Sequence, residues 1–349
     1  MGSNTRKILV GGLAVGGGAP VSVQSMLCAP PRDISANIAQ AAALEEAGCQ
    51  ILRVAIPDAE SVRLIPAIKE AVGIPLVADI HFDYKLALES AAAGVDKIRI
   101  NPGNIGGPEK VAQVAKACRE KKIPIRVGVN AGSLERELLA RRGGPTPAAL
   151  VESALGQIAL LERCDFTDIA VSLKCSDVRG TVEACRLFAQ TSNYPQHIGV
   201  TESGTEEMGI VKSAIGIGSL LLDGIGDTIR VSLTADPVRE VKAGIDILRA
   251  LGLRKGINVI SCPTCGRCQI DLIPLAQAVE KAMANLDGSL TVAVMGCAVN
   301  GPGEAAHADI GVAGGAGEGL LFAGGKILKK VPQEEILEEL LKLARSIDN

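Results

Sequence analysis

The sequence predicts an α/β protein that consists of an N-terminal (β/α)₈ barrel and a smaller C-terminal α/β domain. Short β-branched segments alternate with Ala- and Leu-rich segments eight times over about 230 residues, which is the size and rhythm of such a barrel. A cysteine-rich segment of different character then begins near Lys255. We therefore expect a barrel at residues 1–254 and a second domain at 255–349. An open doubly wound sheet is the alternative arrangement of the first domain.

Eight segments have the β-branched composition of buried strands. They are Val21–Met26, Ile51–Ile56, Leu76–Phe82, Lys97–Asn101, Ile125–Asn130, Ile169–Lys174, His197–Glu202 and Thr228–Leu233. The helical segments between them include Ser35–Ala47, Ala59–Val72, Glu109–Lys121, Pro147–Arg163 and Pro237–Leu251. The early run KILVGGLAVGGG lacks the spacing and the strand–turn–helix context of a nucleotide loop. It is therefore expected to form a hairpin that covers the bottom of the barrel.

The C-terminal domain is predicted to begin with a strand, a cysteine-rich turn and a helix. These elements are Asn258–Ser261, the turn at SCPTCGRC, and Ile270–Asn285. A strand at Leu290–Gly296, a Gly-Pro-Gly turn and two more short strands follow. An amphipathic helix from Pro332 to about Ile347 completes a small α/β domain.

Composition and charge exclude several classes of protein. The 349 residues include 36 Lys and Arg against 39 Asp and Glu, a net charge of −3, so no basic field points to nucleic acid or a membrane surface. Aromatic residues make up 2%, too few for base-stacking platforms. No apolar run approaches the roughly 20 residues of a membrane span, and the N-terminus lacks a signal or transit pattern. We expect a cytoplasmic protein whose ten cysteines are not structural disulfides.

Polar and apolar residues alternate along the predicted strands. Ile98 and Ile100 oppose Arg99, and Val127 and Val129 oppose Arg126. The apolar residues must face the helices, so the polar ones point into the barrel, mostly toward the C-terminal strand ends where barrel active sites lie. The inward set includes Arg53, Asp79, His81, Arg99, Asn101, Arg126, Asn130, Lys174, Glu202, Arg230 and Ser232.

The inward set carries an excess of positive charge. Five cations (Arg53, Arg99, Arg126, Lys174 and Arg230) stand against the carboxylates of Asp79 and Glu202, which leaves three positive charges. Internal ion pairs are one interpretation, but two carboxylates do not neutralise five cations. We therefore predict a strongly anionic ligand, a phosphate or diphosphate held by arginine forks, with Asn101, Asn130 and Ser232 as further hydrogen-bonding partners.

Four cysteines of the C-terminal domain are spaced as metal ligands. Cys262, Cys265 and Cys268 form C-x₂-C-x₂-C, and Cys297 follows in MGCAVNGPGE. Closely spaced thiolates on a turn, with a distant loop that closes the site, suit either zinc or an iron–sulfur cluster. The spacing alone does not decide between the two. Of the six cysteines of the barrel, Cys49, Cys118 and Cys185 fall in helical segments and are expected to be buried small side chains. Cys175 follows Lys174, where inert packing is favoured over a place at the mouth of the barrel.

The sequence resembles a known family in many long motifs. They include VQSM, RVAIPD, VADIHFDYKLAL, RINPGNIG, IRVGVNAGSLE, SLKCSDV, GVTESG, KSAIGIGSLLLDGIGDTIRVSLTADP, SCPTCGR and GCAVNGPGEA. These motifs are similar to those of the 4-hydroxy-3-methylbut-2-enyl diphosphate synthases of the methylerythritol phosphate route to isoprenoids. The resemblance runs from about Thr5 to Lys330 and matches the two-domain bacterial form.

The resemblance implies a [4Fe–4S] cluster bound by three thiolates and a glutamate. The matching positions are Cys262, Cys265, Cys297 and Glu304. Cys268 departs from the pattern, because the family does not depend on a cysteine there. We interpret Cys268 as a bystander, and competition with Glu304 for the fourth ligand position is the alternative.

The resemblance also implies the reaction. Two electrons enter 2-C-methyl-D-erythritol 2,4-cyclodiphosphate, its ring opens, water leaves, and a linear allylic diphosphate forms. The barrel cations, with Asn101, Asn130 and Ser232, would hold the diphosphate. Asp79, His81 and Glu202 would line the carbon skeleton, with Glu202 the best candidate for proton delivery.

The family's partners are a second copy of the chain and an electron donor. In the family, the cluster of one chain covers the barrel of the other in a head-to-tail homodimer. The sequence does not tell whether ferredoxin or flavodoxin donates the electrons. Two other interpretations remain open: a zinc-containing or metal-free barrel enzyme that acts on another phosphorylated small molecule, and a non-catalytic iron–sulfur sensor or carrier. The cationic barrel argues against the carrier.

Overall fold

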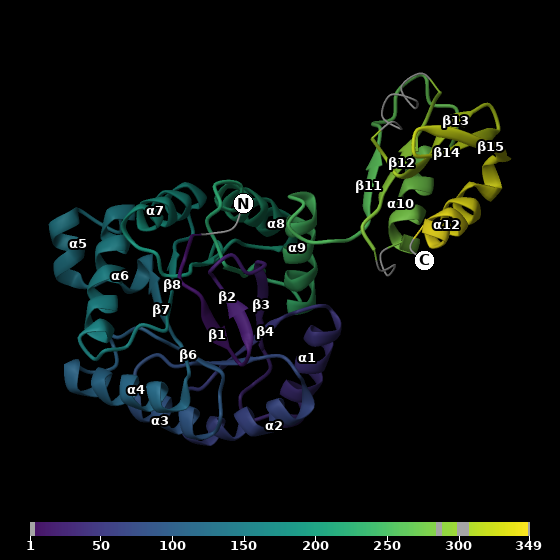
Figure 1. Ribbon diagram of the computed structural model, residues 1–349. Coiled ribbons are helices and arrows are strands. Elements are labelled where there is room, and N and C mark those ends of the chain that lie inside the picture. The colour runs from purple at the N-terminus through teal and green to yellow at the C-terminus, as the bar shows by residue number, and fades with distance from the viewer. Residues whose placement is uncertain (1–3, 284–287, 299–306, 348–349) are drawn as a thin grey trace. The chain divides into compact units, whose positions relative to one another are not determined.

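A computed structural model describes residues 4–283, 288–298 and 307–347. The chain divides into two compact units, Met1–Leu251 and Gly252–Asn349. Helices surround the strands of the first unit, and helices pack on the sheet of the second (Figure 1). Among the helices of the described ranges, none is long and apolar enough to cross a bilayer.

The first unit is a barrel of eight parallel strands in the order β8-β7-β6-β5-β4-β3-β10-β9. They are β3 (Ser22–Met26), β4 (Ile51–Ala55), β5 (Leu76–Asp79), β6 (Lys97–Ile100), β7 (Ile125–Asn130), β8 (Ile169–Lys174), β9 (His197–Ile198) and β10 (Thr228–Ile229). A parallel bridge between Val171 and Gln196 joins the two ends of the sheet. The predicted barrel is thereby confirmed, and the open doubly wound sheet is excluded.

Strands β9 and β10 are two residues long, where the sequence predicts six. A side chain at Gly199 would lie 2.3 Å from the carbonyl oxygen of Arg230, so the two backbones approach each other closely just beyond the ladder. Three residues further on, Glu202 has a φ of 53°, which no strand residue can adopt. The chain therefore leaves the ladder early and forms loops at the C-terminal end of the barrel.

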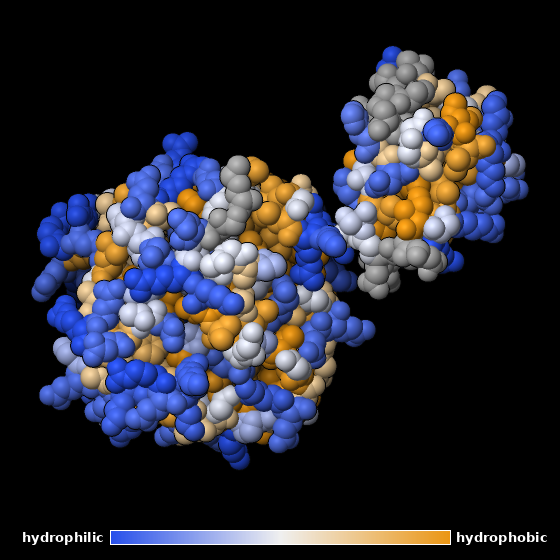
Figure 2. Space-filling view, in the orientation of Figure 1, coloured by the Kyte–Doolittle hydropathy of each residue, from blue (hydrophilic) through white to orange (hydrophobic). Residues whose placement is uncertain are grey.

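Helices follow the strands and cover the outside of the barrel (Figure 1). They are α1 (Ile34–Glu46), α2 (Leu64–Ala71), α3 (Tyr84–Ala92), α4 (Pro108–Lys121), α5 (Arg136–Arg142), α6 (Pro147–Glu162), α7 (Val178–Thr191), α8 (Glu206–Leu222) and α9 (Pro237–Ala250), with short 3₁₀ turns η1 (Glu60–Arg63) and η2 (Ala131–Ser133). Hydrophilic side chains cover much of the visible outer surface of this unit (Figure 2). Several helices begin at a side chain that accepts a backbone N–H, such as Asp33 for α1 and Asp177 for α7.

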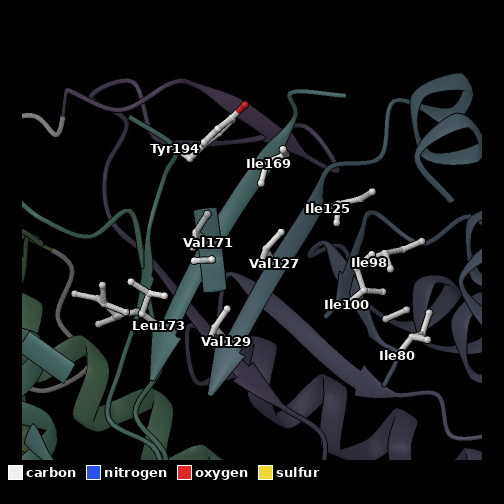
Figure 3. Close-up of a cluster of buried hydrophobic side chains, with 14 of the residues drawn as sticks. Ile80, Ile98, Ile100, Ile125, Val127, Val129, Ile169, Val171, Leu173 and Tyr194 are labelled. Carbon is white, nitrogen blue, oxygen red and sulfur yellow. The ribbon is translucent and has the colours of Figure 1, made fainter. Parts of the chain in front are cut away.

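The apolar side chains of the strands form the core between the barrel and its helices. Val127 and Val129 of β7 and Val171 of β8 are at most 1% exposed and lie along neighbouring strands (Figure 3). This agrees with the period-two pattern of the sequence. Phe82 is an exception, because its side chain is 74% exposed. Strand β5 ends at Asp79, so the alternation no longer determines where Phe82 points.

The hairpin predicted at the bottom of the barrel is confirmed. Strands β1 (Ile8–Val10) and β2 (Leu13–Val15) pair antiparallel. Their buried side chains pack against inward-facing residues at or near the starts of β4, β5 and β8, namely Ile51, Val77 and Ala170. An apolar plug therefore fills the N-terminal end of the barrel, and the polar interior lies above it.

The second unit contains one five-stranded sheet in the order β11-β12-β13-β14-β15. The strands are β11 (Asn258–Ser261), β12 (Thr291–Met295), β13 (Ile310–Gly315), β14 (Glu318–Ala323) and β15 (Lys326–Pro332). Strands β11 to β13 run parallel, and β13 to β15 run antiparallel. Three strands follow β12, where the sequence predicts two, because Gly317 and the pair Gly324 and Gly325 each allow a tight turn with positive φ.

Two helices pack on this sheet, α10 (Leu272–Met283) and α12 (Ile336–Ile347), the latter after the 3₁₀ turn η3 (Gln333–Glu335). Their buried faces, which include Val279 and Leu340, join Val292 and Val294 in one core. The amphipathic helix predicted at the C-terminal end is thus confirmed. The predicted end of the other helix, at Asn285, lies outside the described residues.

Candidate active site

The polar side chains of the barrel strands are buried inside it, as the alternation predicts. Asp79, Arg99 and Arg126 are 1%, 5% and 1% exposed. Arg99 and Arg126 occupy matching positions of neighbouring strands, as do Asn130 and Lys174 nearer the C-terminal strand ends. The barrel geometry therefore gathers residues that are far apart in the sequence into one charged interior.

Asp79 holds two of the arginines. Its carboxylate lies 2.5 Å from Nη2 of Arg53 and 3.1 Å from Nη1 of Arg99. Nε2 of His81 lies 3.1 Å from the same carboxylate. Burial alone would raise the pKa of Asp79, but the charge of Arg53, the hydrogen bond with His81 and the charge of Arg99 hold it well below its usual range. Asp79 is thus an ionised hub that fixes both guanidinium groups.

Glu240 holds a third arginine, and the sequence does not reveal this residue. It lies on helix α9, is 5% exposed, and its carboxylate is 3.6 Å from Nη2 of Arg230. It also accepts the backbone N–H of Leu233 at 2.8 Å. Burial raises the pKa of Glu240 in spite of the opposing charge of Arg230. An acidic residue near the start of a helix normally faces solvent, so helix periodicity gave no sign that this one points inward.

Glu202 is not one of the two buried carboxylates that balance the cations, although the sequence predicts that it is. The sequence pairs it with Asp79 against the five cations, but the structure leaves Glu202 exposed on the loop after β9. Glu240 instead supplies the second carboxylate. The excess of three positive charges stands, because five cations still face two buried carboxylates, Asp79 and Glu240. The positive φ of Glu202 is a strained conformation of a kind that clusters at functional sites.

Several nitrogen atoms of the buried arginines have no hydrogen-bond partner in the described parts of the chain. Nε and Nη1 of Arg126 are buried without a hydrogen bond, as are Nε of Arg53 and Nε of Arg230. Burial, with the neighbouring charges of Arg53 and Arg99, lowers the pKa of Arg126 well below its usual value. Burial and the charge of Arg230 do the same to Lys174. Buried cations without counter-charges are costly, so this interior is built to receive an anion.

Glycines make room for two of the cations. A Cβ atom at Gly128 would lie 2.5 Å from Nε of Arg99. A Cβ atom at Gly199 would lie 3.0 Å from Nζ of Lys174. Real Cβ atoms essentially never approach other atoms within 3.0 Å, so an inward side chain at Gly128 would displace Arg99.

The remaining predicted residues lie on the loops and strand ends around this interior. The His81 side chain is 55% exposed, and its Nδ1 is 3.4 Å from Nη1 of Arg99. Asn101 is buried, and Asn130 is half-buried at the end of β7. Ser232 is half-buried, and its carbonyl accepts the hydroxyl of Ser203.

The cysteines of the second unit gather at one end of its sheet. Cys262 follows β11, and Cys297 lies two residues beyond the end of β12, which is its parallel neighbour. The N–H of Gly296 donates to Sγ of Cys262 at 3.3 Å, and Sγ of Cys268 lies 2.5 Å from where a Cβ of Gly296 would stand. Cys265 is exposed on the loop between Cys262 and Cys268.

The donor set fits an iron–sulfur group in its chemistry, because thiolates and a backbone N–H directed at sulfur are what such clusters use. Within the described ranges, however, no three His, Cys, Asp or Glu side chains stand in position to hold one metal ion. Glu304, the expected fourth ligand, lies outside the described residues.

Fold and site together define a (β/α)₈-barrel protein with a cluster of buried cations in the barrel interior and a second domain that bears cysteines. The chain belongs to the GcpE family. The model of the GcpE TIM-barrel domain matches residues 5–245, and that of the GcpE protein C-terminal domain matches residues 258–346.

Curated relatives match nearly the whole chain. A 4-hydroxy-3-methylbut-2-en-1-yl diphosphate synthase (flavodoxin) of Geobacter sulfurreducens is 57% identical over 342 residues, 98% of this chain and 97% of the relative. The protein of the same name from Clostridium perfringens is 56% identical over 344 residues, 98% of this chain and 99% of the relative.

Solved structures support the barrel fold alone. A dihydropteroate synthase from Xanthomonas albilineans superposes with a TM-score of 0.51 at 12% identity and covers 70% of this chain and 97% of its own. A type I 3-dehydroquinate dehydratase from Clostridium difficile gives a TM-score of 0.50 at 15% identity, with coverage of 71% and 98%.

Proposed function

We propose that this protein is a 4-hydroxy-3-methylbut-2-en-1-yl diphosphate synthase of isoprenoid biosynthesis. It would convert 2-C-methyl-D-erythritol 2,4-cyclodiphosphate, two electrons and two protons into (E)-4-hydroxy-3-methylbut-2-enyl diphosphate and water. The observation that carries the proposal is the set of buried guanidinium nitrogens of Arg53, Arg126 and Arg230 that have no hydrogen-bond partner among the described residues, which favours a bound anion. The curated relatives, which match at least 97% of the chain, carry this enzyme's name.

The diphosphate would occupy the barrel interior. Arg126 and Lys174 have no carboxylate within 4 Å in the described part of the chain, so they are the cations most available to its oxygens. Arg53, Arg99 and Arg230 are held in place by Asp79 and Glu240 and would direct their remaining donors at the same ligand. Asn101, Asn130 and Ser232 would complete the hydrogen bonds.

Two candidate roles follow for the groups predicted to line the carbon skeleton. Asp79 is almost fully buried and engaged with two arginines, so it would act as a positioning residue rather than touch the substrate. His81 and Glu202 are exposed on the loops that follow β5 and β9, and Glu202 would deliver the proton to the departing hydroxyl.

Cys262, Cys265 and Cys297, with Glu304 from outside the described residues, would hold the [4Fe–4S] cluster. Bound there, the cluster supplies the two electrons of the reaction, which protein side chains cannot provide. The N–H of Gly296 would stabilise the negative charge of the Cys262 thiolate. Cys268 would remain a bystander, because its thiol hydrogen-bonds to the carbonyl of Ile270 at 3.2 Å.

The electron donor would be flavodoxin, as the names of the relatives state, with ferredoxin as the alternative. None of the ten cysteines forms a disulfide, in keeping with a reducing cytoplasm.

The active form would be a head-to-tail homodimer. A helix that follows a barrel strand returns to the N-terminal end of the barrel, so α9 carries the chain away from the end where the cations lie. A second copy could then bring its cysteines to this barrel.

Mixing two inactive variants tests the dimer. Arg126→Ala would damage the barrel site and Cys297→Ser the cluster, and a mixed head-to-tail dimer contains one undamaged pair. About a quarter of wild-type activity should return after subunit exchange. No recovery in a mixture shown to contain mixed dimers would refute the shared site.

Metal analysis separates the proposed enzyme from a zinc-containing or metal-free barrel enzyme. Protein purified without oxygen should contain iron and acid-labile sulfide in equal amounts, with a reduced-cluster signal in electron paramagnetic resonance. Zinc without sulfide would remove the redox chemistry and leave an anion-binding barrel. An iron–sulfur carrier without an enzyme activity would bind the cluster but not the cyclic diphosphate.

A further inference from the structure

Three polar side chains lie in the barrel interior below the C-terminal strand ends and have no role in the site described above. Gln24 comes from β3, Lys97 is the first residue of β6, and His197 is the first residue of β9. Each is at most 2% exposed. Both amide atoms of Gln24 and both ring nitrogens of His197 are buried without a hydrogen-bond partner in the described structure. We call these three residues the polar floor.

The position of the polar floor follows from the strand register. Lys97 pairs with Val77, whose side chain packs on the apolar plug of the hairpin, and Arg99 lies two residues further along β6. The floor therefore lies between the plug below and the arginines above. Buried polar atoms are nearly always hydrogen-bonded, so four such atoms without partners in one interior indicate a group that the folded chain alone does not supply.

Lys97 faces almost only positive charge. The charged and titratable groups of the barrel interior are Arg53 on β4, Asp79 on β5, Arg99 on β6, Arg126 on β7, Lys174 on β8, His197 on β9 and Arg230 directly after β10, and the charges of Arg126 and Arg53 act on Lys97. Asp79 is the only carboxylate on the eight described barrel strands, and Arg53 and Arg99 already pair with it. No ion pair within 4 Å joins Lys97 to a carboxylate of the described residues.

This environment disfavours the charged form of the lysine. Burial, then the charges of Arg126 and Arg53, lower the pKa of Lys97 to about 7. The pKa of His197 is also lowered, first by burial and then by the charge of Arg126. In the free protein at pH 8, therefore, Lys97 is mostly neutral although its usual pKa is 10.5.

We propose that Lys97 is a positioning residue of the anion site, and that one proton enters with the bound diphosphate and settles on its Nζ. The identity of the ligand rests on the proposed function, but the proton uptake requires only a diphosphate bound among the arginines. The negative charge of the ligand offsets Arg126 and Arg53, which otherwise keep Lys97 neutral. The imidazole of His197 and the amide oxygen of Gln24 do not hydrogen-bond to Nζ in the described structure, so they would accept from the new ammonium group only after a side-chain rearrangement.

The proposal predicts how the affinity for the diphosphate changes with pH. Well below pH 7, Lys97 already carries its proton in the free protein, and binding takes up almost none. Above pH 7, binding must take a proton from solution, so affinity falls as the pH rises. The cyclic diphosphate itself does not titrate in this range, because each phosphorus bears one strongly acidic oxygen. Any proton uptake therefore belongs to the protein.

Titration calorimetry of the anaerobic holoenzyme with the cyclic diphosphate, in buffers of different ionisation enthalpy, counts this proton. About one proton should be taken up at pH 8 and close to none at pH 6. Lys97→Arg should keep most of the affinity and lose the uptake, since an arginine is already protonated. Lys97→Met should lose the uptake and bind about tenfold more weakly at pH 6. Lys121→Met, on the outer surface of α4, is the control and should behave as wild type.

Two results would overturn the proposal. Wild-type affinity that does not change between pH 6 and pH 9 would show that no proton is coupled to binding, and this result needs no variant to fold. Uptake that persists in both Lys97 variants would assign the proton to another group, such as Lys174. Failure of the proposed function is a separate result: the cyclic diphosphate would not bind. Inorganic pyrophosphate, corrected for its own ionisation, would then test Lys97.

Discussion

Asp79 shows how one carboxylate organises a cationic site. It accepts from Arg53 and Arg99 and is almost fully buried, so its charge is compensated before any ligand binds. The folded state holds its pKa below the unfolded value of about 3.9. A group with a depressed folded pKa stabilises the protein above its unfolded pKa, and this contribution is lost as the pH falls below about 4.

Asp79→Asn should therefore destabilise the protein by about 3 kcal/mol at pH 7, because two buried guanidinium groups lose their counter-charge. The difference from wild type should shrink as the pH falls below about 4. Added cyclic diphosphate should raise the melting temperature of the variant more than that of wild type, since the anion replaces the missing charge. Equal shifts in both proteins would contradict the assignment of Asp79 as counter-charge to the site.

Substitution of Gly128 by alanine tests whether the room beside Arg99 is needed, and the same substitution at Gly132, four residues further on, is the matched control. Gly128→Ala would place a Cβ atom 2.5 Å from Nε of Arg99, whereas a Cβ atom at the nearby Gly132 meets nothing within 4 Å. We expect Gly128→Ala to fold and to bind the cyclic diphosphate about tenfold more weakly, because the Arg99 guanidinium must move. Gly132→Ala should bind as wild type does. Calorimetry on both variants decides, and equal affinities would refute the steric role of Gly128.

The strands were predictable because their period of two is simple. Each of β7 and β8 has one apolar and one polar side, and this pattern alone placed Arg126 and Lys174 inside the barrel. The pattern failed where strands end: β9 and β10 stop early, and Phe82 lies beyond the end of β5.

Two charged residues of the interior escaped sequence analysis. Glu240 lies on a helix, where acidic side chains are usually solvated, and nothing in the helical period distinguishes it. Lys97 begins its strand, where a lysine normally marks an exposed end. The cysteine spacing indicated a metal site but did not identify the metal, and Glu304 came only from the family resemblance.

The β1–β2 hairpin is expected to stabilise the barrel from below. Ile8 is 2% exposed in the apolar plug, whereas its neighbour Leu9 is 54% exposed. Ile8→Ala should cost about 2–4 kcal/mol of unfolding free energy, and Leu9→Ala should cost less than about 0.5 kcal/mol. Urea denaturation of both variants measures the difference. Similar losses would show that the hairpin does not pack as a plug.

The two units are expected to carry separable parts of the site. Cys297→Ser should lose the intact cluster and keep the affinity of the barrel for the cyclic diphosphate. Arg126→Ala should keep iron and sulfide but bind the diphosphate at least about tenfold more weakly, because a charge-assisted pair contributes roughly 1.5–3 kcal/mol. Iron analysis and calorimetry on each variant measure both properties. Loss of the cluster in both variants would contradict two separate modules.

The central claim is that the anion site of the barrel and the cysteines of the second domain serve one reductive reaction. The most direct measurement is anaerobic turnover of 2-C-methyl-D-erythritol 2,4-cyclodiphosphate with reduced flavodoxin, followed by ³¹P nuclear magnetic resonance. The account predicts that the signals of the cyclic diphosphate give way to those of a linear allylic diphosphate, with two electrons consumed per product and no turnover by Arg126→Ala or Cys297→Ser. An iron-loaded protein that binds the cyclic diphosphate, accepts electrons and leaves the ring intact would contradict it.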